Sequence, residues 1–123
     1  FTTKELWHNP ELGTAFNSPV LKDDLVFGIN ERGLFYCLNA KTGKTAWADT
    51  TRRDRFGSVL DAGTVMLALC ANSELVAFTP SGAAYEELAK IKVASTPTYA
   101  HPVVAGNRFF IKDNETLALY TLQ

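Results

Sequence analysis

Short apolar runs separated by small polar turns recur along the whole chain. The runs are rich in Val, Leu, Phe and Tyr and are bounded by Gly, Asn, Asp or Ser. Runs of this kind predict β-strands. Those at residues 25–29 and 65–70 are almost wholly apolar, which is typical of strands buried on both faces of a sheet. Between the runs, pairs such as Asp23-Asp24 predict tight turns.

The runs repeat with a period near forty residues. Units open at Ser18-Pro19-Val20, Ser58-Val59-Leu60 and His101-Pro102-Val103. Within the units, Cys37, Ala77 and Ala118 are spaced by 40 and 41 residues, and Trp7 and Trp47 by 40. A period of this size, filled only by short β-type segments, predicts β-propeller blades.

The fold class that follows is all-β, with about three blades of four antiparallel strands in one partial propeller over residues 1–123. We expect blade repeats at about 16–49, 57–89 and 101–122, with residues 4–8 forming the fourth strand of a preceding or closing blade. That count gives about twelve strands. A closed propeller needs at least four blades. The expected partners are therefore the remaining blades of a longer parent or a second copy of this chain.

Composition narrows the classes of function. Apolar residues make up 46% and charged residues 20% of the chain, and the net charge is −1. This balance is that of a folded chain with no general attraction to nucleic acid or anionic membranes. No apolar run is long enough for a membrane span. Cys37 and Cys70 form no CxxC motif, and we expect both to be buried as small apolar residues, a single disulfide being the alternative.

The segment from Cys37 to Trp47 carries the most specific motif. It resembles the repeat of pyrroloquinoline-quinone-type propellers, Ala-x-Asp-x-x-Thr-Gly-x-x-x-Trp, with Thr42, Gly43 and Trp47 matching. The resemblance implies that Trp47, and Trp7 at the end of an earlier motif, dock onto a neighbouring blade near its Gly turn. The last unit, from residue 97 onward, is similar to the C-terminal blade of such propellers.

The second unit has no tryptophan at the end of its motif. Residues 85–91 contain good helix formers, but we interpret them as the fourth strand of the blade. Tyr85 or Leu88 would then substitute for the missing tryptophan.

The resemblance also bears on function. Enzymes of this family bind pyrroloquinoline quinone with Ca²⁺ and carry a vicinal cysteine pair, whereas Cys37 and Cys70 are far apart in sequence. The chain therefore resembles the non-catalytic branch, which includes the lipoprotein of the outer-membrane β-barrel assembly machinery. We expect a periplasmic or extracellular module that binds proteins, with no catalytic residue and no cofactor. The alternatives are a fragment of a quinoprotein dehydrogenase, whose parent would hold the quinone and Ca²⁺, and a carbohydrate- or polymer-binding propeller.

One dense cluster of charge lies between the first and second units. Arg52, Arg53 and Arg55 fall in the connection between blades. Such a segment is either a solvated loop or an edge that binds anions, because arginine forks match carboxylates and phosphates. His8 and His101 have no second ligand nearby in sequence, so we expect no metal site.

Overall fold

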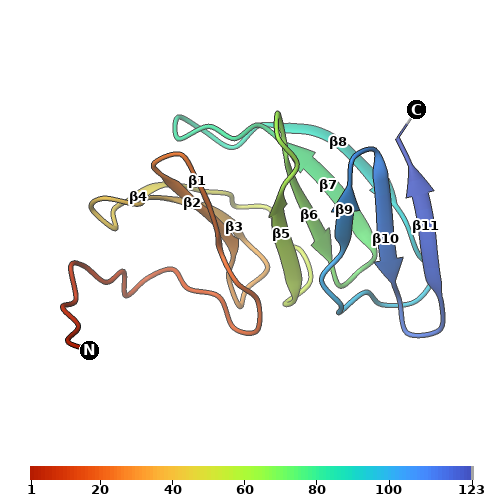
Figure 1. Ribbon diagram of the computed structural model, residues 1–123, viewed down its shortest axis with the longest axis horizontal. Coiled ribbons are helices and arrows are strands. Elements are labelled where there is room, and N and C mark those ends of the chain that lie inside the picture. Colours follow the sequence, from red (N-terminus) through yellow and green to blue (C-terminus); the bar gives the residue numbers. More distant parts are fainter. Residues whose placement is uncertain (123) are drawn as a thin grey trace.

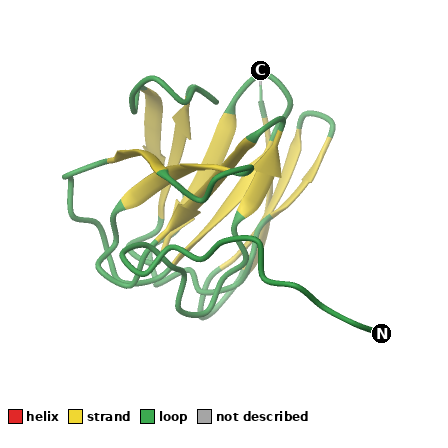
Figure 2. Ribbon diagram, turned by 90° about the vertical axis from the view of Figure 1, so that its left-hand side faces the viewer, coloured by secondary structure: helices red, strands yellow, loops and turns green. Residues whose placement is uncertain are grey.

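The protein is built of three antiparallel sheets that follow one another in chain order. The computed structural model describes residues 1–122 and contains eleven strands, with no helix in that range. Figure 1 shows the sheets standing side by side, and Figure 2 shows that all remaining chain is loop. The predicted all-β fold is confirmed. These residues provide no helix with the length and apolarity needed to cross a bilayer.

The first sheet has the order β1-β2-β3-β4. Its strands are β1 (Val20–Lys22), β2 (Leu25–Ile29), β3 (Phe35–Asn39) and β4 (Thr45–Ala48). Asp23 and Asp24 connect β1 to β2, and Asp23 adopts a φ of 53°. Aspartate tolerates this left-handed conformation better than most residues, so the predicted turn is confirmed.

The second sheet repeats this order and lies between the other two. Its strands are β5 (Gly57–Asp61), β6 (Met66–Cys70), β7 (Glu74–Phe78) and β8 (Glu87–Lys92). Met66, Ala68 and Cys70 of β6 pack toward the first sheet, whereas Leu67 and Leu69 pack toward the third. Every residue of β6 is buried. Its apolar run therefore predicted burial on both faces correctly.

The third sheet has three strands, β9 (Val103–Ala105), β10 (Arg108–Lys112) and β11 (Leu117–Thr121), in the order β11-β10-β9. Its register corrects the proposed repeat by one residue. Ala118 pairs with Ile111, which is buried against the second sheet. The counterpart of Ala77, on the face turned away from the preceding sheet, is Leu119. A shift of one residue exchanges the two faces of a strand.

Residues 4–8 form no strand. A strand needs a partner strand, and these residues lie in the loop segment that precedes β1 (Figure 2). The expected strand at 4–8 is therefore absent, and eleven strands are found within residues 1–122 instead of twelve. The strand predicted for residues 85–91 is found at Glu87–Lys92, as β8, and no helix forms there.

Two apolar clusters hold the sheets together. The first lies between the first and second sheets and comprises Phe27, Ile29, Phe35, Cys37, Trp47, Val59, Met66, Ala68, Cys70, Val76 and Phe78. The second lies between the second and third sheets and comprises Leu67, Leu69, Val93, Phe109 and Ile111. Burying one large apolar side chain contributes about 1.5–3 kcal/mol, so packing between sheets is a main source of stability.

Candidate functional site

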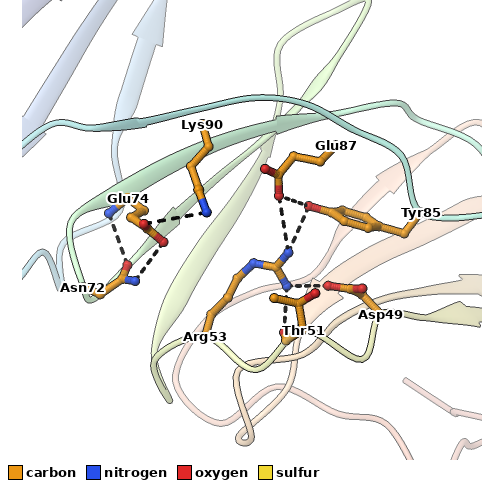
Figure 3. Close-up of polar contacts among 8 residues, drawn as sticks. All are labelled: Asp49, Thr51, Arg53, Asn72, Glu74, Tyr85, Glu87 and Lys90. Carbon is orange, nitrogen blue, oxygen red and sulfur yellow. Dashed lines mark hydrogen bonds and ion pairs between the residues drawn. The ribbon is translucent and has the colours of Figure 1, made fainter.

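Arg53 lies at the seam between the first and second sheets (Figure 3), with its side chain only 5% exposed. Its Nη1 donates to Asp49 Oδ2 at 2.6 Å and to the Thr51 carbonyl at 3.0 Å. Its Nη2 donates to the Tyr85 hydroxyl at 3.0 Å and lies 3.7 Å from Glu87 Oε2. Asp49 follows β4, whereas Glu87 begins β8. The guanidinium thus joins the two sheets through charge-assisted hydrogen bonds.

Aromatic rings surround the same guanidinium. Its central carbon lies 3.8 Å from the Phe35 ring centroid and 5.3 Å from that of Tyr85. Both distances are within cation–π range. Burial raises the pKa of Tyr85, although the charge of Arg53 opposes this shift. The hydroxyl therefore stays protonated and donates to Glu87 Oε2 at 3.0 Å.

The other two arginines of this loop are placed differently. Arg52 and Arg55 are exposed, and the Arg55 guanidinium lies 5.8 Å from the Phe56 ring centroid. Because Arg53 is occupied by carboxylates of its own chain, an anion-binding edge would depend on Arg52 and Arg55. Anion binding by this loop stays a prediction.

Two tryptophans make the same contact with successive sheets. The Trp47 indole donates to the Ser81 carbonyl at 2.7 Å, in the connection between β7 and β8. The Trp7 indole donates to the Ala40 carbonyl at 2.9 Å, in the connection between β3 and β4. Each indole therefore reaches the turn before the outermost strand of a sheet to which it does not belong.

Gly43 makes the Trp7 contact possible. A Cβ at this position would overlap the Trp7 ring, and the residue has a φ of 71°. Glycine alone combines this conformation with so close an approach. Asn9 adds a further link, since its Nδ2 donates to the Gly43 carbonyl at 2.9 Å.

Thr42 stabilises this turn through hydrogen bonds with Asn39 and Lys44, and none of these bonds involves a tryptophan. Asn39 Oδ1 accepts from the backbone N–H groups of Lys41 and Thr42, each at 3.0 Å, and from the Thr42 hydroxyl at 3.2 Å. Asn39 stands at the Asp position of the Ala-x-Asp-x-x-Thr-Gly-x-x-x-Trp pattern. The tendency of Asn to close such turns with its side chain was the signal for this role.

Neither Tyr85 nor Leu88 takes the place of the tryptophan missing from the second sheet. Tyr85 packs 5.6 Å from Trp47, between ring centroids, on the side of the first sheet. Leu88 lies at the register shift of β8. The residue that pairs as Trp47 does is Ala89. Spacing alone missed this because the connection between β7 and β8 is longer than that between β3 and β4.

Both cysteines are free and fully buried in the cluster between the first and second sheets, as expected. Burial raises the pKa of Cys37 to about 11 and that of Cys70 to about 12. Since the thiolate is the reactive form of cysteine, both thiols are inert at neutral pH.

The two histidines lie apart from each other and from this seam. His8 Nδ1 lies 3.2 Å from Glu5 Oε1 on the surface, and His101 lines an open pocket beside Tyr99. Within residues 1–122, no three His, Cys, Asp or Glu side chains gather closely enough to hold a metal ion.

Three aromatic rings lie close together, each just before the first strand of a sheet. Phe16 precedes β1, Phe56 precedes β5 and Tyr99 precedes β9. The Phe56 centroid lies 5.6 Å from that of Phe16 and 6.1 Å from that of Tyr99. Phe16 and Tyr99 are exposed, so the repeat places an accessible row of rings across the three sheets.

Comparison with known proteins supports the fold. No protein-family model and no curated protein matches the sequence. The structure of BamB from Moraxella catarrhalis superposes with a TM-score of 0.69 at 19% identity, over 84% of this chain and 32% of BamB. The chain thus spans about a third of the length of BamB. The computationally designed protein Ika4 superposes with a TM-score of 0.53 at 7% identity, over 99% of this chain and 100% of Ika4. At these identities the likeness to BamB shows the fold, which is that of β-propeller blades.

Proposed function

We propose that this chain is a non-catalytic segment of a β-propeller that acts as a protein-binding scaffold, in the periplasm or outside the cell. The observation that supports this proposal is the outer face of the third sheet. Val103, Leu117 and Leu119 on this face are 56%, 69% and 53% exposed. Apolar side chains gathered on one exposed sheet face mark a surface for another protein.

The other two sheets indicate what such a face receives. Phe27 and Cys37 are on the corresponding face of the first sheet and are buried by the second sheet. Leu67 is on that face of the second sheet and is buried against the third. In each case the cover is another sheet of the same type. The face of β9–β11 is therefore suited to a further propeller blade.

For the 123-residue chain, the blade that we propose is the first sheet of a second copy. Leu21 of β1 is exposed and apolar, so the first sheet offers an apolar surface at this strand, although Leu38 on the same face is buried. Two copies joined head to tail in both directions give six blades, which exceeds the minimum for a closed propeller. Closure also covers sheet edges and faces that otherwise promote aggregation.

Sedimentation of two matched variants tests this surface. Leu119→Lys places a charge on the outer face of the third sheet and is expected to weaken self-association at least about tenfold. Leu88→Lys changes a half-exposed leucine on β8 and is expected to leave association within about twofold of the parent. Equal effects of the two substitutions, or no effect of Leu119→Lys, would rule out this face as the binding surface.

A carbohydrate- or polymer-binding function is the second candidate, and the row of Phe16, Phe56 and Tyr99 favours it. Aromatic rings combine large contact area with few rotatable bonds, and Ser18, Ser58 and His101 lie beside them with polar groups. Affinity electrophoresis in soluble polysaccharides tests this candidate. Tyr99→Ala is expected to abolish retardation, whereas Leu88→Ala keeps it. Migration of the parent protein that no polysaccharide retards would exclude this function.

A further inference from the structure

Trp47 has a structural counterpart in the second sheet, and that counterpart is alanine. Trp47 of β4 pairs with Cys37 of β3, and Ala89 of β8 pairs with Ala77 of β7. In both sheets the register shifts directly after this pair. The two outer strands therefore share one geometry, bulge included, and Ala89 lies where an indole lies in the first sheet.

Both residues turn toward the sheet that follows. Cys37 and Trp47 belong to the cluster between the first and second sheets. Ala77 packs against the cluster between the second and third sheets. Because residues directly opposite each other in a sheet share a face, Ala89 points toward the third sheet. Where the Trp47 indole fills the space between the first and second sheets, only the Ala89 methyl group lies between the second and third.

A cavity of about 420 Å³ occupies this position. Its lining includes Leu67, Ala77, Ala89, Val104, Phe109 and Leu122. Thr64 and Lys90 are its polar members. The volume falls within the range of about 300–1,000 Å³ that is typical of ligand pockets. The cavity is partly open to solvent and its lining is mostly apolar, as is usual for sites that bind small molecules.

The backbone beside the cavity also offers the acceptor that an indole requires. Leu119 holds the position in the third sheet that Cys37 holds in the first. Leu122 lies three residues after Leu119, as Ala40 lies three residues after Cys37, so Leu122 corresponds to Ala40. The Ala40 carbonyl accepts from Trp7. Leu122 lines the cavity, and its carbonyl accepts a long hydrogen bond, at 3.4 Å, from Asn107 Nδ2. A carbonyl oxygen has two lone pairs, so it can accept an indole N–H.

We propose that the cavity between the second and third sheets is a binding site for a free planar aromatic ligand of the indole class. Such a ligand supplies the ring that β8 lacks, with Leu67 and Phe109 on its faces and the Leu122 carbonyl on its N–H. The site is separate from the outer face of the third sheet, so it does not depend on the scaffold function.

Titration of the 123-residue protein with indole tests the site, by calorimetry and by intermolecular nuclear Overhauser effects. Saturable binding of one indole, with contacts to the Ala89 methyl and the Phe109 ring, is expected. Ala89→Trp should fill the cavity and abolish binding. Leu88→Trp adds the same side chain at a neighbouring position outside the lining and should preserve binding. Failure of the parent to saturate, or binding retained by Ala89→Trp, would overturn the proposal.

Two further measurements keep the outcome decisive. If Ala89→Trp does not fold, Ala77→Leu fills the cavity from β7 and should also abolish binding. N-acetyltryptophanamide presents the same indole on a peptide backbone, and we expect it to bind more weakly than free indole. Equal or tighter binding of this compound would contradict a free ligand and assign the cavity to the tryptophan of a partner protein.

Discussion

The Trp47 indole donates to the Ser81 carbonyl at 2.7 Å, and this bond links the first sheet to the second. Forty residues earlier, the Trp7 indole makes the equivalent bond to Ala40. Trp47 is 9% exposed, and its ring also packs 6.1 Å from Phe27 and 6.3 Å from Phe78, between centroids. The same indole-to-carbonyl hydrogen bond therefore occurs twice, forty residues apart: Trp47 links the first sheet to the second, and Trp7 links the N-terminal loop to the first sheet.

Trp47→Phe should lower the free energy of unfolding by about 2–4 kcal/mol. The change removes the N–H donor to Ser81, leaves a half-buried acceptor without this partner and creates a small cavity. Urea denaturation measures the loss. Trp7→Phe is the matched control and should cost less, because Trp7 is only half-buried. A larger loss for Trp7→Phe would contradict the account of the seam.

Gly43→Ala should destabilise the protein more than Gly63→Ala. Both glycines have positive φ, 71° and 87°, so each alanine incurs strain of about 1–2 kcal/mol. At Gly63 the new methyl meets open space, whereas at Gly43 it displaces the Trp7 ring. Thermal unfolding compares the two. In a Trp7→Ala background the penalty of Gly43→Ala should fall to that of Gly63→Ala, and an unchanged difference would argue against docking.

Arg53→Met should cost about 3 kcal/mol of stability, because it leaves Asp49, whose side chain is only 12% exposed, without its cation. Arg52→Met is the control, since an exposed arginine should change stability by no more than about 0.5 kcal/mol. Guanidinium denaturation measures both. Similar values for the two variants would show that the cluster at the seam contributes little.

Asp113 should make stability depend on pH in the acid range. The backbone N–H groups of Thr116 and Glu115 lower its pKa from 3.8 to about 2. A carboxylate with a lowered pKa contributes stability above its unfolded pKa and loses it as pH falls toward the folded value. Unfolding between pH 5 and about pH 2 should therefore lose part of its slope in Asp113→Asn, which keeps the accepting oxygen. A slope unchanged by the substitution would refute this role.

The fold was predictable because the same pattern of apolar and polar positions recurs in each unit, even where the individual residues differ between units. The burial of β6 on both faces and the tight turn at Asp23 followed from residue types alone. The register of the outer strands did not, because the length of a connection and the position of a bulge decide which residue faces the next sheet. Ala89 was therefore missed as the counterpart of Trp47, and Ala118 was aligned in place of Leu119.

The candidate site was predictable only in part, for a related reason. The motif pointed to Trp47 and Gly43, which do lie at contacts between segments. Charge density pointed to Arg53, but sequence does not reveal that Asp49 and Glu87 occupy it from two different sheets. The way the sheets stack decides which residues distant in sequence contact each other, and only the three-dimensional structure shows that stacking.

The mass of the protein in solution tests the central claim most directly. Multi-angle light scattering across a wide concentration range should show a discrete species with twice the mass of the 13.5 kDa chain. This result is expected if the outer face of β9–β11 receives the first sheet of a second copy. A monomer at every concentration, or a series of ever larger polymers, would contradict the closed assembly.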